Sequence, residues 1–358
     1  MLLYIRVEDV LGDEAPQPRR PRPLATLPPT LSLFYDAAMR HHARAVALRV
    51  PGGREREALP DWKLDRLVIR IALYGREKLG LEPGTRVLVF GKLGWLWPAV
   101  ELAVQGFGAA AVGVEHDVDD VALLDAVRRA EPRFLVATDA ESSKRILELR
   151  RSGLVPKVAL LAEEPAGTSG EVLLLSQLLE LGGTLDTPER AQAFRLLCRR
   201  VEPPAEALWH VGPRGTLRLS HALAMERLRA RIASRPPAGG DVLYLQQPRA
   251  TLAARLALAA AVGDGLTEAV FGGEATTGAQ LSGLRPHALL ASAAWLESVC
   301  RGQGPRWPAG LDARRARRRL QERLGDRLRW VETERPTDEA TAAALAAAGI
   351  DGVAEDEA

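Results

Sequence analysis

Short apolar segments alternate with longer amphipathic segments along most of this sequence, and this alternation limits the fold more than any other feature. A continuously apolar strand is typical of a sheet that is buried on both faces, as in parallel sheets covered by helices. The first half contains predicted strands at 86–90, 109–114, 133–137 and 157–161, separated by predicted helices at 95–107, 119–130 and 141–151. We therefore predict an α/β fold with largely parallel sheets flanked by helices.

The same alternation returns after Glu202-Pro203-Pro204, a turn-rich stretch that suits a domain boundary. Strands are predicted near Leu208 and at 242–245, 268–271, 288–290 and 328–331. We predict two associated α/β subdomains, residues 31–202 and 203–350. Residues 1–30, rich in Pro and Arg, are predicted to be an extended lead-in, and residues 351–358 an acidic tail.

Composition excludes several classes of protein. The 358 residues are enough for about two domains, and a formal net charge of +2 gives no global field that would recruit nucleic acid or a membrane surface. The sequence contains neither a signal-peptide pattern nor an apolar run of about 18 residues, so we predict no membrane span. The two cysteines do not form a disulfide framework, and a reducing cytoplasm is the expected compartment.

The stretch Ala205–His221 combines a predicted strand, a glycine turn and a predicted helix that starts after Ser220. In such an arrangement, free backbone N–H groups point at an anion. The candidate ligand-binding residues are Gly212, Arg214, Gly215, Arg218, Ser220 and His221. The alternative interpretation is a tight turn that joins a strand to a helix, with His221, beside Ser220 near the helix start, in a local capping role. No catalytic residue is predicted.

Other patterns suit structural roles. The arginine-rich segment 314–319 lies between leucines, which favours an exposed helix face over a nucleic-acid site. His210, between Trp209 and Val211, suits a core histidine. No group of His, Cys or Asp residues has the spacing of a metal site, so no metal is predicted. Because no lysine follows Lys157, a mechanism that needs a lysine in the second half is excluded.

Three stretches carry a family resemblance. Residues 62–87 contain a helix pattern followed by Pro83-Gly84-Thr85-Arg86-Val87, residues 95–114 contain Gly106-Phe107-Gly108-Ala109, and residues 285–297 begin with Arg285-Pro286. In this order they resemble the N-terminal domain of AMP-forming acyl-CoA synthetases, the adenylate-forming superfamily that includes luciferase, with long-chain fatty acid–CoA ligases closest in pattern. The resemblance runs over about residues 26–350 and implies the fold of that N-terminal domain.

The sequence departs from the family where the family carries out adenylation. The family loop Thr-Ser-Gly-Thr-Thr-Gly-x-Pro-Lys-Gly wraps the ATP phosphates and is followed by a Ser-His or Thr-His pair. Here Gly212 and Gly215 keep the Gly-x-x-Gly spacing and Ser220-His221 matches the pair, but the loop is about three residues shorter and has no lysine. Residues 332–336 replace a glycine-rich turn. The family's ribose-binding Asp and the C-terminal lid domain with the adenylation lysine are absent from the sequence.

Each missing donor to the reacting phosphate typically costs ~2.7–4 kcal/mol of barrier, so we predict a non-catalytic, acyl-CoA synthetase-like pseudoenzyme of fatty acid metabolism. It would act through a protein partner, through self-association, or through an acyl or nucleotide ligand in the vestigial cleft. One alternative is a residual AMP-forming fatty acid–CoA ligase, or a half-enzyme completed by another chain. ATP or AMP and Mg²⁺ are expected as cofactors only in that case. Another alternative is a structural or assembly protein.

Overall fold

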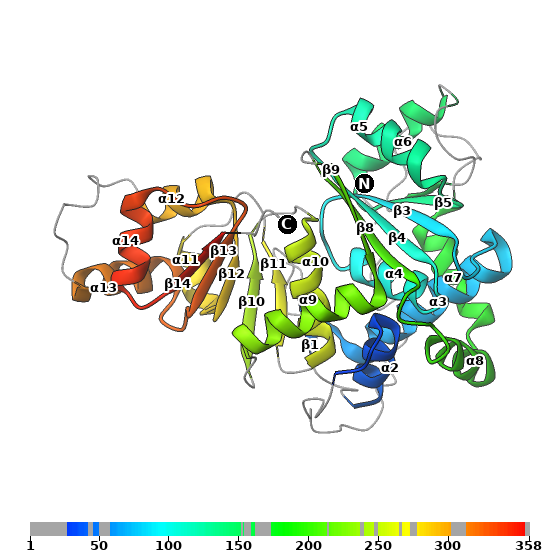
Figure 1. Cartoon of the computed structure of the whole chain (residues 1–358), viewed down its shortest axis with the longest axis horizontal. Helices are drawn as coiled ribbons and strands as arrows, with labels where there is room; N and C mark the ends of the chain where they lie inside the picture. The colour runs from blue at the N-terminus through cyan, green and yellow to red at the C-terminus, as the bar shows by residue number, and fades with distance from the viewer. Residues whose placement is uncertain are drawn as a thin grey trace. The chain divides into compact units, whose positions relative to one another are not determined.

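The computed structural model describes residues 27–41, 46–49, 58–151, 153, 159–161, 173–212, 215–236, 240–246, 250–264, 267–272, 278–301 and 313–354. These residues fall into two compact units. The first unit takes in the chain up to Ala47, Leu59–Pro236 and Arg249–Gly265, and the second takes in Leu48–Ala58, Pro237–Pro248 and the chain from Leu266. Each unit is an α/β layer structure, as the sequence predicts (Figure 1).

The first unit is built on a seven-stranded sheet in the order β7-β6-β5-β3-β4-β8-β9. Every neighbouring pair is parallel except β8 and β9. The strands are β3 (Arg86–Gly91), β4 (Ala110–Glu115), β5 (Phe134–Ala137), β6 (Ala159–Leu161), β7 (Leu173–Leu174), β8 (Glu206–Gly212) and β9 (Gly215–Ser220). The helices are α2 (Leu31–His41), α3 (Asp61–Leu79), α4 (Leu96–Gln105), α5 (Asp120–Ala130), α6 (Ala140–Arg151), α7 (Leu175–Leu185), α8 (Pro188–Cys198), α9 (His221–Ser234) and α10 (Leu252–Asp264).

Helices cover both faces of this sheet, which explains why its strands are apolar throughout. α5 and α6 lie over one face. α4 lies over the other face, and α3 packs against α4 (Figure 1). All residues of β4 are buried, and its alternate positions contribute to different layers. Val112 and Val114 pack with β3, β8, α5 and α6 in one apolar cluster. Gly113 and Glu115 face the opposite side of the sheet, since successive side chains of a strand alternate.

The second unit contains a sheet in the order β14-β13-β12-β10-β11-β1-β2. Its strands are β1 (Val46–Arg49), β2 (Ala58–Pro60), β10 (Asp241–Leu245), β11 (Thr267–Phe271), β12 (Ala288–Leu290), β13 (Trp330–Thr333) and β14 (Asp351–Ala354). The pairs from β14 through β1 are parallel. Its helices are α11 (Gly278–Leu284), α12 (Ala293–Arg301), α13 (Ala313–Leu324) and α14 (Glu339–Ala347). They share an apolar core with the sheet.

The structure divides the chain elsewhere than at the predicted boundary of residues 202 and 203. β8 and β9 belong to the first unit because β8 pairs with β4, with Leu208 opposite Ala111 and Val211 opposite Val114. The predicted acidic tail also changes, since residues 351–354 form strand β14 beside β13. Residues 355–358 and most of the predicted lead-in, residues 1–26, lie outside the described residues. Within the described ranges, the helices are too short or too polar to cross a bilayer.

Candidate functional site

The predicted ligand-binding stretch forms a β-hairpin followed directly by a helix. Gly212, at the end of β8, pairs with Gly215, at the start of β9, and only two residues lie between them in the sequence. Those two residues, including Arg214, lie outside the described residues. Helix α9 begins at His221, in agreement with the predicted start after Ser220. The sequence did not indicate that residues 215–220 form an antiparallel strand.

Ser220 caps helix α9. Its backbone is extended, and its Oγ accepts a hydrogen bond of 3.2 Å from the backbone N–H of Leu223. This geometry satisfies one of the N–H groups that a helix N-terminus would otherwise offer to an anion. Ser220 is therefore the capping residue, whereas the sequence favours local capping by its neighbour His221.

His221 is a core residue in this structure. Its side chain is completely buried (0% exposed), and neither ring nitrogen has a hydrogen-bond partner among the described residues. Burial lowers the pKa of His221 to about 4, because the charged imidazolium loses its hydration. The imidazole is therefore neutral near pH 7 and brings no positive charge to the hairpin.

Arg218 lies over an indole ring. Its guanidinium carbon is 3.8 Å from the centroid of Trp209, the residue directly opposite it in the β8–β9 pairing. Arg86 approaches the same ring at 4.8 Å and pairs with Glu206 at 3.1 Å. A cation on an aromatic face is held by the ring quadrupole. The sequence-predicted cation is thus engaged with its own strand partner, away from the Gly212–Gly215 turn.

A histidine–carboxylate pair lies beside the hairpin, and the sequence analysis missed it. His210 Nε2 is 3.3 Å from Oε1 of Glu115, and both residues stand near the carboxyl ends of parallel strands β8 and β4. A methyl group at Gly212 would lie 3.0 Å from that imidazole nitrogen and 3.2 Å from that carboxylate oxygen. Open α/β sheets bind ligands at this edge. Here the edge carries a polar pair that occupies the space beside Gly212.

The same face of the sheet holds a buried arginine. Arg255 of α10 donates hydrogen bonds of 2.6 Å to Glu101 Oε1 and 2.6 Å to the carbonyl oxygen of Trp209. The indole N–H of Trp97 donates to the same Oε1 at 2.8 Å. A methyl group at Gly113 would lie 2.6 Å from the Arg255 guanidinium, so the glycine makes room for it. A single arginine near the start of an otherwise apolar helix was the sequence signal for this network.

A small cavity adjoins this network. It has a volume of about 30 Å³ and lies among α2, α4, α10 and β8, with Tyr35, Gln105 and Arg255 among its lining residues. A cavity of this size can hold ordered water.

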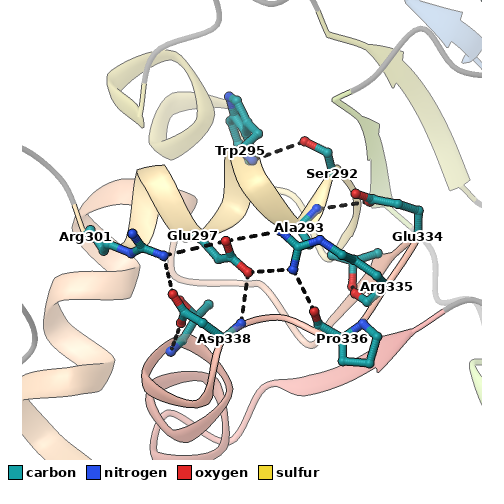
Figure 2. A network of polar contacts seen from close by, with 11 residues as sticks. Ser292, Ala293, Trp295, Glu297, Arg301, Glu334, Arg335, Pro336 and Asp338 are labelled. Carbon is teal, nitrogen blue, oxygen red and sulfur yellow. Dashed lines mark hydrogen bonds and ion pairs between the residues drawn. The ribbon is translucent and has the colours of Figure 1, made fainter. Parts of the chain in front are cut away.

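In the second unit, the carboxyl end of β13 is held by ion pairs (Figure 2). The Glu297 carboxylate of α12 accepts hydrogen bonds from Arg335 at 2.9 and 3.3 Å and from the backbone N–H of Asp338 at 2.9 Å. Arg301 approaches the same carboxylate at 3.6 Å and also pairs with Asp338. The hydrogen bonds from Arg335 lower the pKa of Glu297, so this carboxylate stays ionised.

The helix ends next to this network are capped by acidic side chains. Glu334 Oε2 accepts a hydrogen bond of 3.0 Å from the backbone N–H of Ala293, at the start of α12. Asp338 Oδ1 accepts one of 2.8 Å from the backbone N–H of Thr341, at the start of α14. The segment from Glu334 to Asp338 is thus fixed between α12 and α14 by these two carboxylates.

The described residues contain no group of three or more His, Cys, Asp or Glu side chains placed to hold a metal ion. Cys198 and Cys300 are buried free cysteines, and burial raises the pKa of each thiol to about 12. Because the thiolate is the nucleophilic form, neither cysteine is poised for covalent chemistry.

Comparisons with known proteins show which family model and which solved structures this chain resembles. Residues 37–192 match the family model described as AMP-binding enzyme. The luciferase-like enzyme from the nonluminescent mealworm Zophobas morio superposes with a TM-score of 0.68 at 12% identity, over 95% of this chain and 75% of that chain. The N-terminal domain of FACL13 from Mycobacterium tuberculosis gives 0.62 at 15% identity, over 91% and 75%. A comparison with curated proteins gives no match.

A third structure, the A-PCP didomain of carboxylic acid reductase from Segniliparus rugosus in complex with AMP, superposes with a TM-score of 0.69 at 14% identity, over 92% of this chain and 52% of that chain. At such identities the superpositions establish the fold. The resemblance seen in the sequence agrees with these comparisons: residues 37–192 match the AMP-binding enzyme model, and the described chain has the fold of these solved structures.

Proposed function

We propose that this chain is a non-catalytic member of the adenylate-forming fold that acts by binding a partner protein. The observation that carries the proposal is the β8–β9 hairpin. Gly212 and Gly215 are paired across it, so the loop is limited to two residues at the place where the family wraps the ATP phosphates with a longer, lysine-containing loop. Two residues offer too few backbone N–H groups to surround a triphosphate.

The charges near the hairpin support the same proposal. Transfer at the α-phosphate requires donors that neutralise the developing charge, and each one removed typically costs ~2.7–4 kcal/mol. Arg218 is stacked on Trp209, the buried His221 is neutral near pH 7, and no lysine follows Lys157 in the sequence. Even with non-additive losses, adenylation at a useful rate is not expected.

The second unit adds a related argument. Glycines let a backbone approach a planar ring closely, whereas side chains keep it away. The segment after β13 carries Glu334 and Arg335 in place of the family's glycines, and both side chains are engaged with α12. A nucleotide base would have to displace these contacts. We therefore place the function of the chain in its outer surfaces, as expected for a protein that binds and regulates a partner.

The decisive experiment is ATP–pyrophosphate exchange with the full chain and carboxylic acids from acetate to stearate. The proposal expects no exchange above the background without protein. Thermal unfolding with and without ATP and Mg²⁺ provides the second readout, and the proposal expects no shift in the melting temperature. Exchange with any acid would refute it.

The same measurements separate the alternative of a residual ligase or half-enzyme. That alternative predicts stabilisation by ATP and Mg²⁺, and the stabilisation should disappear in Arg218→Ala. The matched control is Arg128→Ala, an exposed arginine on α5. Stabilisation that is retained by Arg128→Ala and lost in Arg218→Ala would favour the half-enzyme. A shift that both variants retain would place ATP elsewhere on the chain.

A further inference from the structure

Helix α13 carries the densest concentration of charge in the described chain. Its twelve residues, Ala313–Leu324, include six arginines and one glutamate. Without these residues, the formal net charge of the sequence would change from +2 to −3. The net positive charge of the chain therefore comes from this one helix, while the remainder is slightly acidic.

Four of the six arginines of α13 form one exposed stripe. At ~100° per residue, Arg314, Arg315, Arg318 and Arg319 fall within an arc of about 140°, with Glu322 inside the same arc. All five residues are exposed, and Arg318 keeps 82% of its side chain accessible while it pairs with Glu322 at 3.0 Å. We call the four arginines the arginine stripe.

The opposite side of α13 is fixed to the unit. Leu320 and Leu324 are buried in the apolar core that the second unit builds around β12 and β13. Arg323 donates hydrogen bonds of 2.8 and 2.5 Å to the carbonyl oxygens of Val299 and Cys300 at the end of α12. α13 packs beside α11 and α14 (Figure 1). The stripe is therefore displayed on a helix whose rotation is set by its buried side.

We propose that the arginine stripe docks an acidic segment of a partner protein, with carboxylates spaced one helical turn apart. This inference rests on the partner-binding function proposed above. The i, i+4 spacing of Arg314 with Arg318 and of Arg315 with Arg319 matches carboxylates at the same spacing on an acidic helix. Each guanidinium presents a planar fork that binds a carboxylate with two hydrogen bonds.

Two other polyanions fit the stripe less well. A nucleic-acid site gains affinity from many phosphate contacts, whereas this stripe is about 8 Å long and the rest of the chain has the opposite net charge. An interfacial helix inserts large apolar side chains into the lipid. The exposed large apolar residues of the described chain lie on other elements, at Val121, Leu181, Leu196, Leu223 and Val353.

The test measures binding of a labelled alanine-rich peptide with glutamates four residues apart to the full chain, by fluorescence anisotropy at low ionic strength. Arg318→Glu with Arg319→Glu should weaken binding at least about tenfold, because two attractive pairs become repulsive. Arg318→Lys with Arg319→Lys keeps the positive charge but loses the planar fork, so its affinity should fall between those of the unmodified chain and the glutamate variant.

Arg128→Glu with Arg129→Glu on α5 is the matched control. It makes the same charge change on an exposed helix, and Arg129 pairs with Asp125 at the same four-residue spacing as Arg318 with Glu322, with the order of the two charges reversed. The control should bind the peptide as the unmodified chain does. Equal losses in both glutamate variants would refute the proposal, as would tighter binding of duplex DNA or phosphatidylserine vesicles through the stripe. The peptide assay does not involve ATP, so a failure to bind the peptide would not contradict the proposal that the chain is non-catalytic. Likewise, ATP–pyrophosphate exchange would not contradict peptide binding by the arginine stripe.

Discussion

Glu101→Gln tests whether the stability of the first unit depends on the negative charge that Glu101 places beside the buried Arg255. The Arg255 side chain is 0% exposed, and its Nη2 lies 2.5 Å from Oε1 of Glu101. Its other hydrogen bonds go to the carbonyl oxygens of Trp209 and Ala111. Glutamine has the shape of glutamate and keeps an acceptor for the indole N–H of Trp97. The substitution therefore removes the negative charge and little else.

The expected loss follows from leaving an uncompensated charge inside the unit. Removing one partner of a buried ion pair costs ~3–5 kcal/mol. Domains are stable by ~5–15 kcal/mol, so the loss should be a large fraction of the total. Urea unfolding monitored by tryptophan fluorescence reports on this region, since Trp97 and Trp209 both belong to the network. The expected result is a clear decrease in the urea midpoint of the first unit.

Two comparisons make this prediction decisive. Glu101→Gln with Arg255→Met removes both charges and should recover much of the loss, because no ion remains to be buried. Asp326→Asn breaks an exposed pair with Arg285, at 2.7 and 2.8 Å, and should leave the midpoint unchanged because water solvates the freed guanidinium. If Glu101→Gln costs less than ~1 kcal/mol, the argument from buried charge is refuted.

Three further outcomes are expected. Gly113→Ala should lower stability by ~1–3 kcal/mol in the same urea assay, because its methyl would lie 2.6 Å from Arg255 and crowd the network; an unchanged midpoint would contradict this packing. The pKa of His221 is about 4 in the fold, below its unfolded value of ~6.5, so the unfolded state binds the proton first and stability should fall as the pH drops from about 6.5 to 4, by up to ~3 kcal/mol. Unfolding midpoints across this range should show a shallower pH dependence in His221→Leu, and an identical slope would refute the assignment. Cys198 and Cys300 should resist alkylation in the native protein and react in urea, as mass spectrometry would show, because burial raises both thiol pKa values to about 12.

Local elements were predictable because their signals are local. The start of α9 after Ser220 follows from a capping residue before an amphipathic segment, and the structure confirms it. Strand β8 was predicted near Leu208 from its apolar run. Its partner was not, since periodicity carries no information about which distant strand lies alongside. The pairing of β8 with β4 is what moves the hairpin into the first unit.

The polar pair beside the hairpin shows the same limit at the level of the site. His210 is flanked by apolar residues and reads as a core histidine in the sequence. Glu115 ends a different strand, and the β4–β8 register, with Gly113 opposite His210, brings the two side chains together. Arg255 likewise meets Glu101 only because α10 and α4 lie on the same face. The sequence shows which charged residues lie inside apolar segments. It does not show which residues they contact.

Open α/β folds bind ligands at the carboxyl ends of their parallel strands. In each unit, the chain's own side chains occupy positions at this edge of the sheet. In the first unit, His210 and Glu115 fill the space beside Gly212. In the second, Glu334 caps α12 and Arg335 is bound to Glu297. Vacating either edge would leave a carboxylate or guanidinium without its partner, which makes ligand entry costly. At the exposed arginine stripe, a docking carboxylate would replace only solvent-exposed contacts such as the Arg318–Glu322 pair, which are worth little. The proposed recognition of a partner through an exposed surface would therefore disturb fewer buried contacts than ligand entry at either edge.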